Sequence, residues 1–277
     1  MPKIRRVERM AALTKMLADR PHELIPLSFF CDYFGIAKST LSEDLLSVRR
    51  AFDAYRLGSL ETVFGAAGGV RYIPYRNGRA ANQVLETMAA KLESGDRIIA
   101  GGFLYMSDIL YDWQWMSAVG EIFMTRFAAT HPDCIMTVET KGILPAMMVA
   151  RAFNKPLVIA RRDSRVTEGS AISINYVSGS TKRIQTMSLT KRALAPNQRV
   201  LIIDDFMKAG GTAKGMKELV YESGSQTVGV GVLVATAEPR EKMTGDYMPL
   251  LVLEGVDEVE RHVRIRPQLE PEEELNE

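Results

Sequence analysis

The stretch that decides the fold of the larger part of this 277-residue chain is Val200-Leu201-Ile202-Ile203-Asp204-Asp205-Phe206-Met207-Lys208-Ala209-Gly210-Gly211-Thr212. Its first four residues are apolar and predict a short buried strand, and its glycine pair predicts a loop that begins a helix over 211–223. Two carboxylates follow the strand directly. Open α/β sheets bind ligands at the carboxyl ends of their strands. We therefore expect an α/β domain with a ligand site at residues 204–212.

The residue types of this loop suit a ribose phosphate. The adjacent carboxylates of Asp204 and Asp205 can accept hydrogen bonds from two vicinal hydroxyls. Gly210 and Gly211 let the backbone approach an anion closely, and the amides of the helix N-terminus, with the Thr212 hydroxyl, can hold a monophosphate. The alternative interpretation is a turn followed by an acidic helix cap.

Strands and helices alternate around this loop. Apolar runs predict further strands at 134–138, 157–160, 228–234 and 250–253, with helical segments at 115–129 and 143–153 and a helix that ends near Leu92. Such alternation is typical of a mostly parallel sheet covered on both faces.

Residues 204–212 resemble the phosphoribosyl pyrophosphate signature of type I phosphoribosyltransferases. The resemblance implies that Asp204 and Asp205 hold the ribose hydroxyls and that residues 208–212 hold the 5′-phosphate. The segment Val138-Glu139-Thr140-Lys141-Gly142 is similar to the same family's pyrophosphate loop, with Lys141 and nearby amides facing the diphosphate. An ordinary strand-to-helix turn is the alternative there. Residues 163–188 match the place of the family's flexible loop, for which a β-hairpin without a gating role is the alternative.

Two positions depart from the family's pattern. Many of these enzymes carry an acidic or small hydroxyl residue where this chain has Lys208, and Thr where it has Ala209. An ammonium group cannot serve as the base for a nucleobase nitrogen, although it can bind a phosphate. The departure favours ligand sensing over catalysis.

The first 75 residues follow a different pattern, of three helices and a hairpin. Helices are expected at 4–18, 27–34 and 38–54, with Ser39 or Thr40 capping the third and Gly58 ending it. Strands at 60–64 and 70–73 follow, joined by a glycine-rich turn. This order is typical of a winged helix-turn-helix, with 38–54 as the recognition helix and its Leu41, Leu45, Val48 and Phe52 facing inward.

Candidate DNA contacts lie on that helix and on its neighbours. Small hydroxyl and basic side chains near the start of a recognition helix suit phosphate and base-edge contacts, which singles out Lys38, Ser39, Thr40, Ser42 and Arg49. Additional backbone contacts are expected from Arg5, Arg6 and Arg71. Acidic Glu43 and Asp44 count against deep insertion into a groove, and a small helical dimerisation module is the alternative.

Charge and composition agree with two modules. Residues 1–79 hold 13 Lys/Arg and 8 Asp/Glu, a net charge of +5, while the whole chain is +1, so residues 80–277 carry −4. A basic front module is expected to lie near a polyanion, although an imbalance of this size also arises by chance.

Cys31 and Cys134 lack metal-ligand spacing and are expected to be reduced core thiols. No membrane span or signal segment is apparent, so we expect a soluble, cytoplasmic protein.

The combination of modules resembles the family of purine operon repressors of Gram-positive bacteria. The match is carried by 22–27, 65–70, 167–170, 173–180 and 201–212, and it covers nearly the whole chain. It predicts a winged-helix DNA-binding domain at 1–75 and a phosphoribosyltransferase-like effector domain at 76–267. The tail at 268–277 lies outside the resemblance, and its acidic composition predicts disorder.

The resemblance also implies what the protein binds. It implies a homodimer on inverted-repeat operators upstream of purine genes, with phosphoribosyl pyrophosphate as inducer. (p)ppGpp is expected to compete for the same pocket, with Phe103 and Phe206 as aromatic walls for its guanine. No tightly bound cofactor is expected, although Mg²⁺ can accompany the effector, and no transferase activity is expected. The competing hypotheses are an active purine or xanthine phosphoribosyltransferase with an added domain, and a DNA-binding protein with a vestigial pocket.

Overall fold

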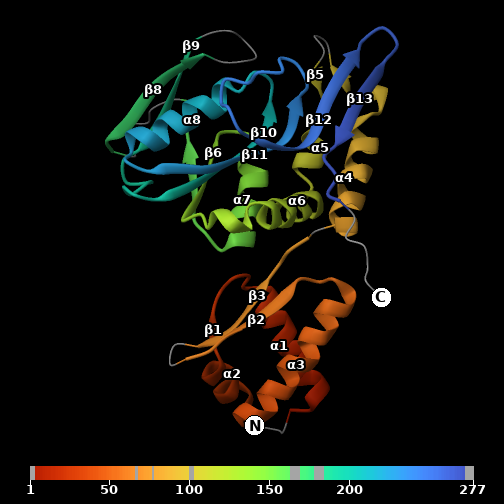
Figure 1. Ribbon diagram of the computed structural model, residues 1–277, viewed down its shortest axis with the longest axis vertical. Coiled ribbons are helices and arrows are strands. Elements are labelled where there is room, and N and C mark those ends of the chain that lie inside the picture. The colour runs from red at the N-terminus through yellow and green to blue at the C-terminus, as the bar shows by residue number, and fades with distance from the viewer. Residues whose placement is uncertain are drawn as a thin grey trace. The chain divides into compact units, whose positions relative to one another are not determined.

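The computed structural model describes residues 4–65, 68–76, 78–99, 103–162, 169–177 and 184–271 (Figure 1). The chain divides into two compact units, Met1–Arg76 with Arg151–Asn154, and Asn77–Ala150 with Lys155–Glu277. Among the described residues, no helix combines the length and the apolar character that a membrane crossing needs.

The front unit has the element order of a winged helix. Its elements are α1 (Arg6–Ala18), β1 (Ile25–Pro26), α2 (Leu27–Phe34), α3 (Lys38–Tyr55), β2 (Ser59–Val63) and β3 (Gly69–Ile73). The strands form an antiparallel sheet in the order β1-β3-β2. The predicted inward stripe of α3 is confirmed, because Leu41, Leu45, Val48 and Phe52 are all buried in one core with Leu13 of α1.

The predicted range of α3, 38–54, agrees with the observed helix to within one residue, but the residues predicted to cap and to end it were wrong. The residue that caps its start is Ala37, and no side chain caps the helix, so neither Ser39 nor Thr40 has that role. The helix ends at Tyr55, and Arg56 adopts the left-handed conformation (φ 54°) before Gly58 is reached. The helix therefore starts three residues after Gly35, which ends α2 in the same left-handed conformation.

The rear unit is a mixed α/β domain. Its helices are α4 (Gly78–Leu92), α5 (Ser107–Leu110), α6 (Trp113–Arg126), α7 (Ile143–Phe153) and α8 (Gly211–Glu222), with 3₁₀ turns at Gly95–Arg97 and Ala128–Thr130. Its strands are β4 (Ile98–Ile99), β5 (Phe103–Leu104), β6 (Cys134–Val138), β7 (Leu157–Ala160), β8 (Ala171–Val177), β9 (Ile184–Thr190), β10 (Arg199–Met207), β11 (Gln226–Thr236), β12 (Met248–Asp257) and β13 (His262–Pro267).

The central sheet has the order β13-β12-β11-β10-β6-β7. All neighbours pair in parallel except β12 and β13, which are antiparallel. The expected mostly parallel sheet is thus confirmed, with an antiparallel edge strand that the sequence analysis did not find. Pro267 ends that edge strand.

Both faces of the sheet are covered, as Figure 1 shows. On one face, Ala213, Met216 and Leu219 of α8 share a core with strand residues such as Met136 and Ile202. On the other face α6 approaches β11 so closely that a Cβ at Gly231 would lie 2.8 Å from the Phe123 ring. Parallel strands buried on both faces are expected to be apolar throughout, which explains why their sequences show runs rather than alternation.

Strand β10 is longer than predicted. The strand was expected to end at Ile203, with Asp204–Met207 in the loop, but these four residues continue the strand. Their backbone pairs with β11, with Asp204 opposite Val232 and Phe206 opposite Val234. Pairing with a neighbouring strand overrides the local signal of two polar residues, which by themselves indicate a strand end.

The segment expected to form a flexible loop contains a hairpin. β8 and β9 pair antiparallel from Ala171 opposite Thr190 to Val177 opposite Ile184. Residues 163–168 and 178–183 lie outside the described residues, so the gating role stays a prediction.

The expectation of a disordered tail from 268 onward was wrong for its first residues. The Glu270 carboxylate accepts from the Gly78 backbone N–H at 2.8 Å and from Arg126 Nε at 3.2 Å. Asn82 exchanges two hydrogen bonds of 2.9 Å with the Glu270 backbone. These contacts hold residues 268–270 against the start of α4. Residues 272–277 lie outside the described part of the chain.

Candidate functional site

A cavity of about 420 Å³ opens at the carboxyl end of β10 and β6. It brings together the two loops that the sequence singled out. The lining residues are Tyr111, Val138, Glu139, Thr140, Lys141, Arg162, Asp204, Asp205, Phe206, Met207, Lys208, Ala209, Gly210, Gly211, Thr212 and Ala213.

Asp204 and Asp205 are the two acidic residues of β10 that line this cavity. Asp204 is only 5% exposed, and its Oδ1 accepts the Asp205 backbone N–H at 3.0 Å. Burial raises the pKa of Asp204 well above its usual range, and the neighbouring Asp205 carboxylate adds to the rise. Burial also raises the pKa of Asp205. Two acids held this way favour a ligand that donates hydrogen bonds or brings positive charge.

Gly142 makes room for the Asp204 carboxylate. A Cβ at this position would lie 2.9 Å from Asp204 Oδ1 and 2.5 Å from Thr137 Oγ1, closer than real Cβ atoms approach. The Thr137 hydroxyl is buried without a hydrogen-bond partner among the described residues. Gly142 is therefore needed for packing between the two loops, in addition to any contact with a diphosphate.

The loop predicted to hold a phosphate, residues 208–212 (the phosphate loop), leads into the N-terminus of α8. Gly210 has φ +82°, a conformation that favours glycine, and it immediately precedes the helix. The loop places Lys208 exposed at the rim and Thr212 half-buried in the first turn. Unpaired amides at a helix N-terminus carry partial positive charge, so this end of the cavity suits an anion.

The second loop, 139–142, lines the same cavity through Glu139, Thr140 and Lys141, whereas Gly142, also expected at this site, is buried and is not among the lining residues. Thr140 and Lys141 are exposed, and the Glu139–Thr140 peptide is cis. Glu139 Oε1 accepts the Arg162 backbone N–H at 2.9 Å, which ties the loop to the residues after β7. The lysine of this loop suits a second anionic group.

Tyr111 and Arg162 also line the cavity, and neither was predicted from the sequence. Tyr111 follows α5, and α5 is anchored by a two-bond ion pair between Arg97 and Asp108, each bond 2.8 Å long. That pair lowers the pKa of Asp108 to about 2. No sequence motif marks Tyr111, because it approaches the cavity only through the fold.

Phe103 was expected to form a wall of the pocket, but it is not among the lining residues. It lies on β5 and is 60% exposed. Gly101 and Gly102, which precede it, lie outside the described residues. Phe206, its expected partner, does line the cavity.

The front unit presents the expected face of α3. Lys38, Ser39 and Ser42 are exposed and Thr40 is half-buried, while Ser42 Oγ donates to the Lys38 carbonyl at 2.9 Å. Glu43 is exposed on the same helix. A second cavity, of about 560 Å³, is lined by residues of α2, α3 and the hairpin turn, among them Lys38, Ser42 and Phe64.

Several predicted DNA-contact arginines have partners within the unit. Arg49 Nη2 donates to Thr62 Oγ1 at 2.8 Å, and Arg71 binds the Glu61 carboxylate at 2.6 Å. Arg5 is exposed, and its backbone N–H donates to Glu8. The sequence pattern could not show these pairings because they join separate elements.

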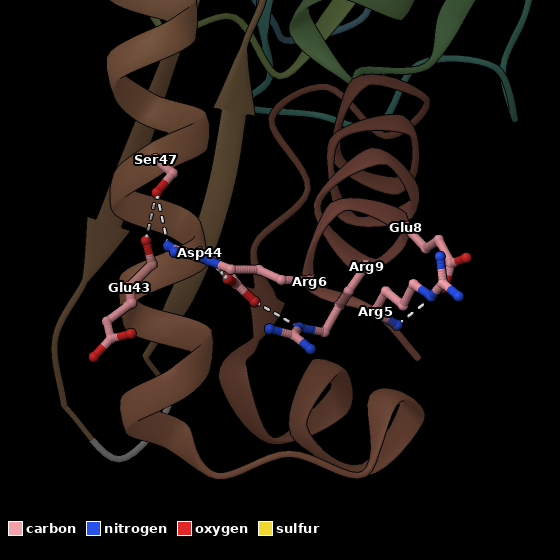
Figure 2. A network of polar contacts seen from close by, with 7 residues as sticks. All are labelled: Arg5, Arg6, Glu8, Arg9, Glu43, Asp44 and Ser47. Atoms are coloured by element: carbon pink, nitrogen blue, oxygen red, sulfur yellow. Dashed lines mark hydrogen bonds and ion pairs between the residues drawn. The ribbon is translucent and has the colours of Figure 1, made fainter. Parts of the chain in front are cut away.

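Arg6 belongs to a larger network that crosses from α1 to α3 (Figure 2). Asp44 is fully buried, and its two oxygens accept from Arg9 Nε at 2.6 Å and Arg6 Nε at 3.1 Å. Arg6 Nη2 also donates to Ser47 Oγ at 3.2 Å. Asp44 thus joins two helices and does not face solvent, so it is no obstacle to a DNA groove, contrary to the expectation from sequence.

Comparisons with known proteins agree with both units. Residues 5–74 match the family model described as bacterial purine repressor, N-terminal, and residues 109–264 match the phosphoribosyl transferase domain. The chain is 46% identical over 264 residues to the purine biosynthesis transcriptional repressor PurR of Bacillus subtilis (strain 168), covering 95% of this chain and 93% of the relative.

A second relative is named as an activator of transcription and not as a repressor. The chain is 36% identical over 263 residues to the purine biosynthesis transcriptional activator PurR of Lactococcus lactis subsp. lactis (strain IL1403), covering 95% and 97% of the two chains. The crystal structure of adenine phosphoribosyltransferase from Rhodothermus marinus DSM 4252 superposes with a TM-score of 0.53 at 20% identity, over 62% of this chain and 99% of that chain. The likeness shows the fold of the rear unit.

Proposed function

This chain belongs to the family of bacterial purine biosynthesis regulators, transcription factors with a phosphoribosyltransferase-like domain, and on that premise we propose that phosphoribosyl pyrophosphate releases it from operator DNA. The observation that carries the proposal is the shared cavity. Two buried acids, a helix N-terminus and a lysine-bearing loop line one space of about 420 Å³. A ligand with vicinal hydroxyls between two phosphate groups matches this arrangement.

Each part of the ligand has a proposed partner. Asp204 and Asp205 accept the ribose hydroxyls, residues 208–212 hold the 5′-phosphate, and Thr140, Lys141 and Gly142 hold the diphosphate. These contacts would place the ribose over the end of β10. We assign this site to an effector domain spanning 76–267 and the DNA-binding domain to 1–75.

(p)ppGpp has a ribose that carries a guanine base and diphosphate groups. We therefore propose that it competes for the same cavity. Phe206 lines the cavity and offers an aromatic wall for the base. Tyr111 lies at the same cavity and offers a second one, whereas the role of Phe103 stays a prediction.

Mg²⁺ fits this site as a companion of the ligand. Within the described ranges, no cluster of three or more His, Cys, Asp or Glu side chains could hold a metal ion. Mg²⁺ is commonly bound through one or two carboxylates together with substrate phosphates. Asp204 and Asp205 would supply the carboxylates and the ligand would supply the diphosphate oxygens.

The DNA-binding face is proposed on the exposed start of α3, at Lys38, Ser39, Thr40 and Ser42, with Arg5, Arg6, Arg49 and Arg71 as flanking contacts. The partner is double-stranded operator DNA with inverted half-sites, bound by a homodimer in the cytoplasm. Arg6, Arg49 and Arg71 have internal partners, so contact with a phosphate would require them to share donors.

The coupling between the two sites is proposed to be a population shift. A ligand can change operator affinity only through its different affinities for the free and DNA-bound forms. The ligand can reorient the front domains, or its negative charge can compete with DNA phosphates. Operator binding measured over a salt series separates the routes, because an unchanged salt slope with ligand present argues against direct competition.

The decisive experiment is a gel shift on a purine promoter with phosphoribosyl pyrophosphate titrated in. We expect the wild-type complex to dissociate, the Asp204→Ala variant to stay bound, and a matched Glu222→Gln variant, changed at an exposed acid at the end of α8, to behave as wild type. Retention of the wild-type complex at saturating ligand would refute the inducer role.

The transferase alternative has its own assay. Pyrophosphate release with xanthine or another purine base would show an enzyme, and the ammonium at Lys208 argues against it because it cannot act as a base there. A vestigial pocket is excluded if calorimetry detects phosphoribosyl pyrophosphate binding that Asp204→Ala removes.

A further inference from the structure

The segment that begins at the end of β11, residues 236–245, forms hydrogen bonds to the phosphate loop. Lys242 Nζ donates to the Lys208 carbonyl at 2.5 Å, and it also donates to the Thr236 carbonyl at 2.7 Å. The Met243 backbone N–H donates to the Ala209 carbonyl at 2.8 Å. Two consecutive carbonyls of the phosphate loop are therefore bound by residues 236–243.

These bonds determine which way the loop's N–H groups point. In a planar trans peptide the carbonyl oxygen and the following N–H point in opposite directions, and neither of these two peptides is cis. The cavity is lined by residues 208–213 but by none of residues 236–245. Since the carbonyls of Lys208 and Ala209 turn toward that segment, the N–H groups of Ala209 and Gly210 turn toward the cavity.

The contact is tight at Gly210, which lies between the segment and α8. A Cβ on Gly210 would lie 3.2 Å from Met243 N and 3.3 Å from both Lys242 Cβ and Thr244 Cγ2. Further along the segment, Lys217 Nζ of α8 donates to the Thr244 carbonyl at 2.8 Å, a bond that involves neither the Lys208 nor the Ala209 carbonyl. The loop therefore has little room to rotate its peptides away from the cavity.

We propose that Lys242 is a positioning residue that presents the Ala209 N–H group to the 5′-phosphate of the ligand, beside the Gly210 N–H, whose peptide is held by the Met243 backbone. The inference rests on the proposed function of the cavity and assigns a part of it to a residue outside the cavity. Successive N–H groups aimed at one point form an anion-binding concavity, whereas the same loop with a rotated peptide would present a carbonyl oxygen to the phosphate.

The surroundings of Lys242 support this role. Its ammonium group is half-buried, and Nζ lies near three acceptor atoms, the carbonyls of Lys208 and Thr236 and the Thr236 hydroxyl. Burial lowers the pKa of Lys242, while the nearby Glu238 carboxylate opposes that change. A lysine with its donors used on protein acceptors acts through the loop and not by contact with ligand.

The test separates the two ends of the ligand. Binding of ribose 5-phosphate, pyrophosphate and phosphoribosyl pyrophosphate to the full-length chain is measured by calorimetry for wild type, Lys242→Met, Lys242→Arg and Lys217→Met. Lys217→Met is the matched control, since it removes a lysine–carbonyl bond from the same segment without touching the Lys208 or Ala209 carbonyls. Thermal melting confirms that each variant is folded.

We expect Lys242→Met to weaken ribose 5-phosphate and phosphoribosyl pyrophosphate by about tenfold or more, as for a lost charge-assisted hydrogen bond. Pyrophosphate binding should change less than about twofold, Lys242→Arg should restore most of the affinity, and Lys217→Met should match wild type.

Other outcomes overturn the inference. Equal loss for ribose 5-phosphate and pyrophosphate would mean that Lys242 contacts the diphosphate or stabilises the whole site. Equal loss in Lys217→Met would assign the effect to the segment as a whole, and no loss in Lys242→Met would remove any role. If wild type binds none of the three probes, the proposed function of the cavity fails and this inference fails with it.

Discussion

Two buried aspartates, one in each unit, have opposite surroundings. Asp44 is fully buried between α1 and α3, and two arginines bind its carboxylate (Figure 2). Asp204 is 5% exposed at the end of β10, and in the described part of the chain no lysine or arginine forms an ion pair with it. The neighbouring Asp205 carboxylate raises the pKa of Asp204 further, and the Arg162 charge opposes this rise only weakly.

The two surroundings correspond to two different roles of a buried carboxylate. A buried charge costs several kcal/mol unless a partner compensates it. Asp44 has its partners within the protein, so it stabilises the packing of α1 on α3. Asp204 lacks such a partner, so the free-energy cost of burying its charged form is not compensated within the protein. A ligand that supplied hydroxyl donors or Mg²⁺ would compensate it. Four predictions follow from this contrast, the largest effect first.

Removal of the Asp44 charge should have the largest effect. Asp44→Asn leaves the buried Arg9 guanidinium without a counter-charge, and breaking a buried ion pair in this way costs about 3–5 kcal/mol. Urea denaturation measures the free energy of unfolding. Asp53→Asn, at an exposed acid on the same helix, is the control and should change it by less than about 0.5 kcal/mol. A loss below about 1 kcal/mol at Asp44 would contradict the structural role.

The matching change at Asp204 should spare stability and remove ligand binding. Asp204→Asn keeps the shape of the side chain but removes a charge that burial disfavours, so the melting temperature without ligand should stay equal or rise. Calorimetry with phosphoribosyl pyrophosphate should show affinity lower by at least about 100-fold, on the order of 3 kcal/mol. A lower melting temperature together with intact binding would reverse the comparison.

The pH dependence of stability should show how strongly burial disfavours the ionised form of Asp204. Because the pKa of Asp204 is raised well above 3.8, the native state keeps a proton that the unfolded chain has lost between 3.8 and the raised value. Unfolding releases that proton, so stability falls as pH rises through this window.

The pH effect is measured as the difference between wild type and Asp204→Asn. On lowering the pH from 7 toward 4, wild type should gain stability over the variant by up to about 1.4 kcal/mol for each pH unit inside the window. If the stabilities of the two proteins changed with pH in the same way across this range, the pKa of Asp204 would not be raised in the native state.

The smallest effect is expected at Arg6. Its side chain is 55% exposed, so its bond to Asp44 should contribute less than about 1 kcal/mol, and Arg6→Gln should barely change the free energy of unfolding. If Arg6 also contacts a DNA phosphate, the variant should reduce the salt slope of operator binding by about 0.9. An unchanged slope would show that Arg6 contacts only its partners within the protein, as in Figure 2.

Much of the fold was predictable because it depends on local patterns. Helix α2 was predicted with its observed bounds, and the inward stripe of α3 was predicted from its spacing. The phosphate loop was predictable because its residues are consecutive, and strand, acids, glycines and helix follow one another along the chain. Where a site is contiguous, its chemistry can be inferred before its geometry is known.

The rest depended on residues that are distant in sequence. Tyr111 reaches the cavity only because α5 is anchored to Arg97, and Glu270 binds the start of α4 from almost 200 residues away. Asp44 looks like a surface acid of an amphipathic helix until α1 packs against it with two arginines. No periodicity or motif carries such information, because each contact is decided by how separate elements meet.

Local signals were enough to predict the winged-helix unit, the mostly parallel α/β unit and the position of the loop at 208–212, because backbone propensity, apolar spacing and glycine placement act over neighbouring residues. Only the tertiary structure decided that β10 runs on to Met207 and that Lys242 holds the phosphate loop. It also decided that one buried aspartate is paired and the other is not. Strand pairing and desolvation are properties of the assembled fold, so they cannot be inferred from any single segment.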